Sequence, residues 1–348
     1  MNLLVTGGAG FIGSNFIHYW LKHHPEDNIV NLDVLSYAGN LENHASIEGN
    51  EHYKFVKGDI TDKDVVFPLV QEVDIVVHFA AETHVDRSIM DPGVFVRTNV
   101  MGTQVLLEAV KEYGTRFHHI STDEVFGALG PDDAPFNEKT AYDPRSPYSA
   151  SKAGADHLVR AYFHTYGIPM TISNCSNNYG PYMFPEKMMP LFISNLLEDK
   201  KVPVYGDGLQ VRDWIHVDDH ARGVDFILQK GTIGETYCLG GNAEKKNIDI
   251  VKLLLAYLGK DESFIEYVTD RPGHDRRYAI DFSKATRELG WKPEVAFEQG
   301  LKEMVEWYVA NQEWVNRCKS GDYQTYYDEW YNKTMKLPAP EGRGISSL

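Results

Sequence analysis

Cysteine is scarce in this chain of 348 residues, which contains only three. Cys175, Cys238 and Cys318 lie far apart in the sequence, so they form neither a CxxC metal-binding pair nor a disulfide framework. Long apolar runs are missing as well, because none approaches the ~20 residues of a membrane-spanning helix. The N-terminus runs from an apolar segment straight into glycines, which is unlike a signal peptide. We therefore expect a cytoplasmic protein in a reducing compartment, with no membrane partner.

Positive charge is also in short supply. The chain has 34 Lys and Arg against 50 Asp and Glu, which gives a formal net charge of -16 at pH 7. Binding to nucleic acid depends on clustered Lys and Arg that displace counterions, so this balance argues against a nucleic-acid partner. A small anionic ligand stays open where a few basic residues converge. The length and the 43% hydrophobic content allow a large core and roughly two domains.

Short apolar segments alternate with longer amphipathic ones through about residue 173. The segments that read as buried strands are 2–7, 28–34, 52–59, 73–81, 117–124 and 170–175. Strands that alternate with helices indicate βαβ units, and continuous apolar strands indicate a sheet covered on both faces. The predicted fold class is α/β, with a Rossmann-type doubly wound parallel sheet.

Proline and glycine become more frequent after residue 176, and the elements become shorter. We expect a dinucleotide-binding domain over residues 1–176. A smaller α/β substrate lobe is expected over 177–335, with helices near 248–258 and 297–311 and some of the chain crossing back. Residues 336–348 are expected to form a loose tail.

The first chemical motif is a GxxGxxG turn made by Gly7, Gly10 and Gly13, between a strand and a helix expected over 11–22. Glycines allow the backbone to approach a pyrophosphate, and the helix N-terminus supplies N–H groups and a positive dipole end. Alone, the motif could be only a tight turn. Asp33 follows about twenty residues later, where a carboxylate can bind a ribose hydroxyl and repel a 2′-phosphate. NAD is therefore favoured over NADP, although Asp33 could merely cap or turn the chain.

The second motif is Tyr148 with Lys152, near the start of a helix expected to reach residue 166. A spacing of four places both side chains on one helical face, where the ammonium can lower the pKa of the phenol and hold a ribose. The tyrosinate could then take a proton from a sugar hydroxyl. As an isolated pair, YxxxK is usually a solvated helix face. Here Thr122, Asp123 and Glu124 stand at the end of a preceding strand, where ligands bind in open α/β sheets.

Taken together, TGGAGFIG, FAAETHVDRS, STDEVFG, the Tyr148/Lys152 pair and NCSNNYGPYMFPEK resemble the extended short-chain dehydrogenases. Within them the chain is most similar to the dTDP-glucose 4,6-dehydratases, over nearly its whole length from residue 2 to about 307. The discriminating feature is the pair Asp123 and Glu124, which epimerases of this group generally lack. Phe126 departs from the family, since many relatives have Tyr at that position.

The resemblance implies an NAD-dependent hydro-lyase that converts dTDP-glucose to dTDP-4-keto-6-deoxyglucose, for deoxysugar synthesis such as that of rhamnose. Tyr148 would take the C4 hydroxyl proton beside Thr122, and Lys152 would orient both partners. Glu124 would then remove the C5 proton, while a protonated Asp123 donates to the departing C6 hydroxyl. Mutual repulsion and burial can hold one carboxyl charged and its neighbour neutral.

Further positions follow from the same resemblance. The NAD-binding residues it implies are Gly7, Gly10, Phe11, Ile12, Gly13, Asp33, Asp59, Ile60, Ala80, Ala81, Asn99, Tyr148, Lys152 and Asn178. The substrate-binding residues it implies are Thr83, Thr122, Asn177, Lys187, Val202, Pro203, Tyr205, Arg212, Asn247, Asp270, Arg271 and His274. Relatives pair helices like those expected near 94–113 and 148–166, so a homodimer is expected.

Arg212 is the strongest physical candidate for gripping the diphosphate, as a guanidinium beside the aromatic Trp214. Its plainer interpretation is a surface ion pair with Asp213 or Asp218. Residues 202–205 could wall the nucleotide base and its sugar.

Several alternatives remain at this stage. An epimerase or decarboxylase would share the fold, NAD and the Tyr/Lys pair, and a related dehydratase could use a CDP- or GDP-sugar. A protein that senses NAD without catalysis is a non-enzymatic alternative. No metal is expected, because the histidine pairs at 23–24 and 118–119 and the run 216–220 lack a convergent third ligand. Cys175 is interpreted as a core residue, and no GxSxG elbow accompanies Ser121.

Overall fold

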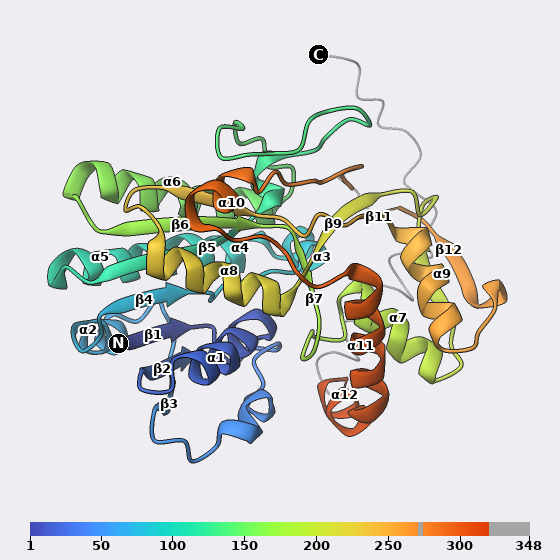
Figure 1. Cartoon of the computed structure of the whole chain (residues 1–348), viewed down its shortest axis with the longest axis horizontal. Helices are drawn as coiled ribbons and strands as arrows, with labels where there is room; N and C mark the ends of the chain where they lie inside the picture. The colour runs from blue at the N-terminus through green and yellow to red at the C-terminus, as the bar shows by residue number, and fades with distance from the viewer. Residues whose placement is uncertain (271–273, 320–348) are drawn as a thin grey trace. The chain divides into compact units, whose positions relative to one another are not determined.

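The computed structural model describes residues 1–270 and 274–319 (Figure 1). Its main sheet has seven strands in the order β10-β6-β5-β4-β1-β2-β3. The strands are β1 (Asn2–Thr6), β2 (Asn28–Asp33), β3 (Tyr53–Lys57), β4 (Ile75–His78), β5 (Arg116–Thr122), β6 (Met170–Cys175) and β10 (Thr236–Leu239). Every neighbouring pair is parallel. The predicted Rossmann-type sheet is confirmed, and β1 lies at the point where the strand order reverses.

Helices cover both faces of this sheet. The longer ones are α1 (Phe11–His23), α2 (Lys63–Gln71), α5 (Thr103–Tyr113), α6 (Pro147–Tyr166) and α8 (Val217–Lys230). Shorter helical elements are η1 (Leu41–Ile47), α3 (Val85–Met90), α4 (Pro92–Phe95), η3 (Asp123–Phe126) and α10 (Ser283–Leu289). Before α5 the chain forms a π-helical segment, η2 (Val96–Gly102), so the helix predicted near 94–113 is interrupted by a wider turn.

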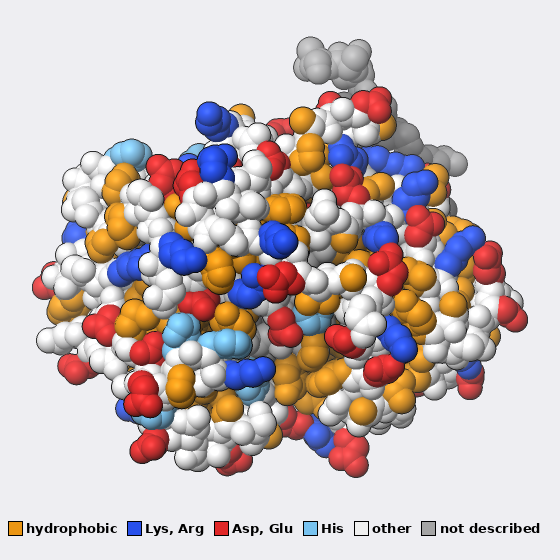
Figure 2. Space-filling model, viewed as in Figure 1, with side chains coloured by type: hydrophobic (Ala, Val, Ile, Leu, Met, Phe, Trp, Pro, Cys, Tyr) orange, Lys and Arg blue, Asp and Glu red, His pale blue; other side chains and the backbone are white. Residues whose placement is uncertain are grey.

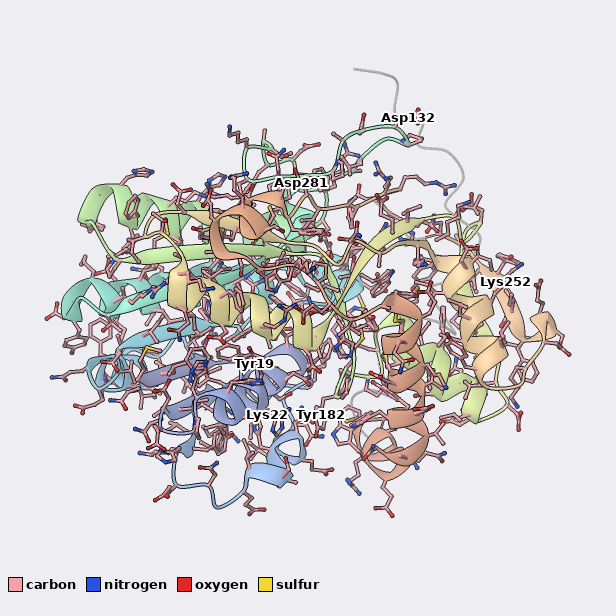
Figure 3. The ribbon with its side chains drawn as sticks, viewed as in Figure 1. Tyr19, Lys22, Asp132, Tyr182, Lys252 and Asp281 are labelled. Carbon is pink, nitrogen blue, oxygen red and sulfur yellow. The ribbon has the colours of Figure 1, made fainter. Side chains whose placement is uncertain are left out.

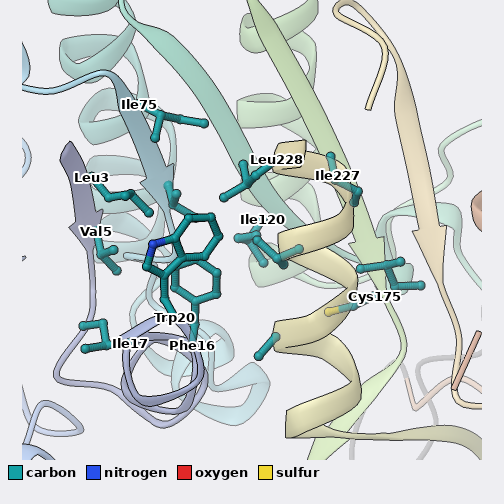
Figure 4. Close-up of a cluster of buried hydrophobic side chains, with 14 of the residues drawn as sticks. Leu3, Val5, Phe16, Ile17, Trp20, Ile75, Ile120, Cys175, Ile227 and Leu228 are labelled. Atoms are coloured by element: carbon teal, nitrogen blue, oxygen red, sulfur yellow. The ribbon is translucent and has the colours of Figure 1, made fainter. Parts of the chain in front are cut away.

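Successive residues of β1 point to opposite faces and enter two separate hydrophobic clusters. Leu3 packs with Phe16 and Trp20 of α1 and with side chains of α8 (Figure 4). Leu4 packs instead with side chains of α2, α5 and α6. Fully burying one such large apolar side chain stabilises the fold by about 1.5–3 kcal/mol. Polar contacts join the same helices, since the Tyr19 hydroxyl of α1 donates to Asp225 of α8 at 3.2 Å (Figure 3).

The sequence itself fixes both ends of α6, the helix that carries Tyr148. Ser146 and Ser149 form a capping box at its start, and Pro147 occupies the first turn. Gly167 ends the helix in the left-handed conformation, with φ of 70°. Tyr148 therefore lies in the first turn of a firmly initiated helix.

The chain divides into two compact units, which are described separately. Unit 1 comprises Met1–Met183, Val211–Lys245 and Asp275–Met304. Besides the main sheet it contains β7 (Asn177–Tyr179) and β9 (Val211–His216), which pair in parallel. Strand β11 (Glu244–Lys246) extends this small sheet at the unit boundary, where α11 (Phe297–Ala310) also lies.

Unit 2 comprises Phe184–Gln210, Lys246–His274 and the chain from Val305 onward. Its elements are α7 (Met188–Leu197), β8 (Val202–Tyr205), α9 (Asn247–Tyr257), η4 (Glu262–Phe264), β12 (Ile265–Val268) and α12 (Gln312–Cys318). Strands β8 and β12 pair in parallel.

The observed units interleave along the chain. β10 becomes an edge strand of the main sheet, so residues 211–245 return to unit 1. The division between a dinucleotide-binding domain that ends at residue 176 and a substrate lobe that begins at residue 177 stays a prediction about function. The tail expected over 336–348 lies outside the described residues. No helix in the described ranges is long and apolar enough to cross a membrane.

Candidate active site

The glycine turn after β1 is built as a close approach of backbone to backbone. Gly7 has a φ of +71°, and a Cβ there would lie 2.6 Å from the backbone of Ala80. A Cβ on Gly13 would lie 2.4 Å from the Gly7 carbonyl oxygen. Gly10 is different, because its Cβ would meet only that same oxygen, at 3.4 Å. The packing of the protein therefore requires Gly7 and Gly13, whereas Gly10 leaves room beside the turn.

That room lies at the N-terminus of α1. Gly10 caps the helix, no side chain of the described residues hydrogen-bonds to the cap, and the first turn contains no acidic residue. This first turn contains the amides of Phe11, Ile12 and Gly13, which form the positive end of the helix dipole. An anion such as a pyrophosphate fits this position without a competing carboxylate.

Asp33 ends β2 and is almost fully buried. Its Oδ2 accepts a hydrogen bond from the Ala9 amide at 2.9 Å, and its Oδ1 accepts one from the Leu35 amide at 2.8 Å. Burial raises the pKa of this carboxyl, against the lowering effect of the two amides. Asp33 thus holds the glycine turn in place, as the capping interpretation requires. Two further carboxylate lone pairs remain for a ribose hydroxyl.

The other predicted NAD contacts follow the ends of neighbouring strands. Asp59 and Ile60 follow β3, and the Asp59 carboxylate accepts from the Thr61 amide at 2.8 Å. Ala80 and Ala81 follow β4. Asn99 is buried in η2 and binds both backbone groups of Glu82, with distances of 2.8 Å and 3.0 Å.

Asn178, in β7, lies among buried polar groups. Its Nδ2 donates to the Ser176 carbonyl at 3.1 Å, and its Oδ1 lies 2.8 Å from Nδ1 of His220. The predicted NAD contacts come from separate motifs of the sequence, and the fold brings them to the carboxyl edge of the sheet.

Strand β5 brings the predicted catalytic residues to the same edge. Thr122 caps the short helix η3, and its hydroxyl accepts from the Glu124 amide at 3.3 Å. The Tyr148 hydroxyl hydrogen-bonds to the Thr122 side chain. Lys152 is buried one turn further along α6, and its Nζ donates to the Ile120 carbonyl at 2.7 Å. Thr122, Tyr148 and Lys152 thus converge, as the spacing predicted.

The pKa of Tyr148 differs from the expectation drawn from the sequence. Burial, and then the nearby Glu124 carboxylate, raise the pKa of the phenol well above its ordinary value, while the Thr122 hydrogen bond lowers it. Burial also lowers the pKa of Lys152. The predicted lowering of the phenol pKa by Lys152 is therefore wrong for the protein alone. Desolvation dominates when the phenol is buried in the first turn of α6.

Asp123 is the most perturbed carboxyl of the site. It is 1% exposed, and its Oδ2 has no hydrogen-bond partner among the described residues. Burial, then Glu124 and Asp213, raise its pKa well above the ordinary value, while Arg212 and the Thr122 hydrogen bond lower it. Glu124, in contrast, is only half-buried. This arrangement favours a neutral Asp123 beside a more exposed neighbour.

Arg212 is buried in β9 rather than placed on the surface. Its guanidinium donates to the Val211 carbonyl at 2.8 Å and to the Asp275 carbonyl at 3.0 Å. The guanidinium lies over the aromatic ring of Tyr278, 4.2 Å from its centre, which the sequence did not suggest. The Asp213 carboxylate accepts from the Gly241 and Ala243 amides at 3.0 Å and 2.8 Å.

Two predicted substrate residues of unit 1 follow β4 and β6. Thr83 lies in the segment after β4, and Asn177 opens β7. Asn177 Oδ1 is buried and has no hydrogen-bond partner among the described residues. A buried acceptor without a partner costs free energy, so a ligand donor would stabilise it.

Unit 2 holds the remaining predicted substrate residues. Val202 and Pro203 are buried in β8, and Lys187 precedes α7. The Tyr205 ring meets His274 edge-on at 6.0 Å, and His274 Nδ1 lies 2.6 Å from Asp270. Arg271 lies outside the described residues.

Asn247 opens α9, and its side-chain oxygen is buried without a partner in the described ranges. The same holds for Oε1 of Gln210, whose Nε2 donates to Asp270 at 2.9 Å. Sequence reasoning missed Gln210, which a search for polar residues beside VPVY would have found.

Comparisons with known proteins agree with this geometry. The sequence profile of a family described as GDP-mannose 4,6 dehydratase matches residues 4–304. A dTDP-glucose 4,6-dehydratase from Escherichia coli is 52% identical, over 95% of this chain and 99% of that protein. The chain belongs to the dTDP-glucose 4,6-dehydratase family.

Solved structures place the fold in the same family. A dTDP-glucose 4,6-dehydratase from Streptomyces venezuelae, crystallised with NAD, matches with a TM-score of 0.90 and 48% identity, covering 92% of this chain and 100% of that one. A UDP-glucose 4-epimerase from Thermotoga maritima matches with a TM-score of 0.83 and 30% identity, covering 90% and 100%. The fold is therefore shared with epimerases, and residues of the site must separate the two activities.

Within the family fold, two features of unit 1 were not foreseen from the sequence. Tyr278 supports Arg212 from a distant segment, and no local signal marks it. Asp156 lies one turn beyond Lys152 and is fully buried. Its spacing of four from Lys152 was visible in the sequence and could have identified it. The described residues contain no group of three His, Cys, Asp or Glu that could hold a metal.

Proposed function

We propose that this protein is an NAD-dependent dTDP-glucose 4,6-dehydratase, a hydro-lyase that forms dTDP-4-keto-6-deoxyglucose. The observation that carries the proposal is the buried Asp123, whose pKa is raised next to Glu124 and beside the hydrogen-bonded Thr122 and Tyr148. Elimination of water needs a neutral acid and a charged base close together at one pH. An epimerase needs neither carboxyl.

The glycine turn, the first turn of α1 and Asp33 fit the cofactor. Open space at Gly10, helix amides without an acidic neighbour and free lone pairs on Asp33 suit a dinucleotide with an unphosphorylated ribose. The chemistry that bound NAD supplies is reversible hydride storage, so it is unchanged after each turnover. Lys152 would bind the ribose next to the nicotinamide.

The side chains of the site divide the proton transfers between them. Tyr148 would take the proton of the C4 hydroxyl as the tyrosinate, beside Thr122. The phenol keeps its own proton in the protein alone, so that proton must leave first, which the ammonium of Lys152 and the positive charge of bound NAD would favour. Oxidation at C4 makes the C5 hydrogen acidic, because it then stands α to a carbonyl. Glu124 removes this C5 proton, and Asp123 gives its proton to the departing C6 hydroxyl. The raised pKa of Asp123 is what makes it the acid of the pair.

Nucleotide contacts are proposed within each unit. Arg212 and Asn177 in unit 1 offer a guanidinium and an unsatisfied buried amide oxygen. In unit 2, the unsatisfied oxygen of Asn247 and the ring of Tyr205 suit a nucleotide base and sugar. Lys187, Asp270, Arg271 and His274 complete this proposed set.

The surface of the protein bears on its proposed partners. Acidic and basic side chains are interspersed on the face shown in Figure 2. Val94, Val96 and Met101 are 43%, 51% and 56% exposed. These apolar side chains belong to α4 and η2, part of the helical region expected to pair, and they support a homodimer. A cytoplasmic location stays a prediction.

The deciding experiment is incubation of the purified protein with dTDP-glucose, without added reductant, followed by mass spectrometry. Loss of one water with no net consumption of NAD supports the dehydratase. Tyr148→Phe is the matched control and should leave the mass unchanged. Unchanged mass with the wild-type protein, together with inversion at C4, would support an epimerase instead. Parallel reactions with CDP-glucose and GDP-mannose test the choice of nucleotide.

A further inference from the structure

Asp156 is a buried carboxylate that the proposed mechanism does not use. It lies in α6 one turn after Lys152, and the two residues are 0% and 4% exposed. Its Oδ2 accepts hydrogen bonds from the Ser121 hydroxyl and from the Tyr142 hydroxyl, both at 2.8 Å. Its Oδ1 lies 3.1 Å from Nε2 of His119. Burying an ionised carboxylate without a compensating charge costs several kcal/mol, so the partners of Asp156 must be identified.

None of these three contacts supplies a positive charge at pH 7. The two hydroxyls are neutral, since burial and then Asp156 raise the pKa of Tyr142 far above its ordinary value. Burial, and then Lys152, lower the pKa of His119 to about 4, so its imidazole is uncharged at neutral pH. Burial raises the pKa of Asp156, but the contact with His119, and then Lys152 and the Ser121 hydrogen bond, lower it below its ordinary value, so Asp156 is ionised at neutral pH.

Two cations flank Asp156 on α6, at spacings of four residues in each direction. Arg160 is turned toward Tyr142, to which its Nη2 donates at 3.2 Å. Lys152 shares a helical face with Asp156 and is deeply buried. Burial lowers the pKa of this ammonium, and Asp156 is the largest influence that raises it. Lys152 is therefore the cation that shares a helical face with Asp156 and can compensate its charge at neutral pH.

Three further titratable groups of the same site, His78, Cys175 and Tyr148, are uncharged at neutral pH. His78 has a pKa well below its ordinary value, because of burial and then His119 and Lys152. Burial, and then Asp123, raise the pKa of Cys175 to about 12. Tyr148 also keeps its proton in the protein alone. Asp156 and Lys152 thus lie on one face of α6, among groups that are uncharged at neutral pH.

We propose that Asp156 is a positioning residue, whose buried carboxylate keeps Lys152 as the ammonium and, through Ser121, fixes the end of β5 that carries Thr122. The proposal rests on the proposed function, because Lys152 affects turnover only where Tyr148 is the proton acceptor. Ser121 is adjacent to Thr122 in β5, and Lys152 donates to Ile120 in the same strand. One carboxylate therefore organises both elements of the catalytic set.

The first test is the pH dependence of kcat for Asp156→Asn, which keeps the shape and removes the charge. Without the carboxylate, Lys152 loses its proton more readily, so the basic limb of the profile should move to lower pH by about one unit. At pH values above the basic limb, this shift appears as a kcat about tenfold lower than that of the wild type. Asp156→Glu should restore the original limb. A purely structural role would lower kcat equally at every pH, and that result would overturn the proposal.

Ser121→Ala and Tyr142→Phe are the matched controls. Each removes one hydrogen bond to Asp156 and leaves its charge in place. They should leave the basic limb at the wild-type position, whatever their effect on the size of kcat. A limb that moves equally in these variants would assign the effect to packing and overturn the proposal.

The second test needs no activity. A double-mutant cycle combines Asp156→Asn with Lys152→Met and follows the urea midpoint of unfolding. Asp156→Asn should lower the midpoint clearly when Lys152 is present and much less when it is replaced. Simple addition of the two effects would show that the charges do not interact. If Asp156→Asn alone does not fold, the double variant should fold, and failure to do so also counts against the proposal.

The two proposals fail separately in these experiments. A wild-type protein that leaves dTDP-glucose unchanged removes the proposed function, while the cycle still decides whether Asp156 and Lys152 are coupled. A normal dehydratase with an additive cycle removes only the role of Asp156.

Discussion

The protonation of Asp123 can be measured through the stability of the fold. Its pKa is raised mainly by burial, so the folded protein keeps the proton above about pH 3.9, where an Asp in the unfolded chain has lost it. In that window the folded state binds more protons, and stability therefore falls as pH rises, until the pKa of the folded state is reached. Replacement by Asn removes the titration and keeps the Oδ1 that accepts from Thr122 at 3.3 Å.

The expected magnitude follows from this linkage. Near pH 4 the wild type and Asp123→Asn should differ little. Above it the variant should gain relative stability at a limiting rate of about 1.4 kcal/mol per pH unit, or about 2.7 kcal/mol over two units inside the window. Above the folded pKa the difference should become constant. Because the variant lacks the acid, it should also lose elimination by roughly 100-fold or more while keeping oxidation at C4.

The assay is urea unfolding of both proteins at half-unit steps between pH 4 and pH 7. Asp132→Asn is the matched control, because Asp132 lies in an exposed surface loop (Figure 3). That variant should track the wild type at every pH. A stability difference for Asp123→Asn that does not change with pH would mean that Asp123 is ionised throughout, and the assignment of the acid would be wrong.

Four further substitutions probe the base and the cofactor site. Glu124→Gln should allow oxidation at C4 and stall elimination, so NADH bound to the enzyme should accumulate and absorb near-ultraviolet light; absence of that signal would remove Glu124 as the C5 base. Asp33→Ala should weaken the binding of NAD and reduce the preference for NAD over NADP in binding titrations. It also leaves the Ala9 amide without its acceptor. Gly10→Ala should lower NAD affinity with little change in urea midpoint, because its Cβ finds room in the protein alone. Gly13→Ala should instead destabilise the fold by about 1–3 kcal/mol, since its Cβ meets the Gly7 carbonyl; equal losses of stability would contradict this difference.

The sequence predicted the structure best at positions where few residue types satisfy the physical requirement. Strands β1 to β6 were recognised because parallel strands covered on both faces are continuously apolar. Gly7, Asp33 and the Tyr148/Lys152 pair could be placed because a strand end, a helix start and a fixed spacing leave few alternatives. All of them reach the carboxyl edge of the main sheet.

Other features depend on segments far apart in the sequence. β10 has four residues in a region rich in turns, so nothing local distinguished it from a loop. The support of Arg212 by Tyr278 joins two distant parts of the chain, and the sequence suggested the adjacent Trp214 instead. The raised pKa of Tyr148 likewise depends on burial, which the YxxxK spacing does not specify.

The geometry of η3 explains how two adjacent carboxyls can take opposite roles. In a 3₁₀ helix each residue turns the chain by a third of a circle, so consecutive side chains point in clearly different directions. Asp123 is directed into the interior and is 1% exposed, whereas Glu124 is half-buried. Desolvation therefore acts mainly on Asp123, and the charge on Glu124 raises the pKa of Asp123 further. A strand would separate the pair onto opposite faces of the sheet. The short turn after β5 thus keeps Thr122 as the cap that hydrogen-bonds to Tyr148, and it fits the proposed roles of Asp123 as the acid and Glu124 as the base.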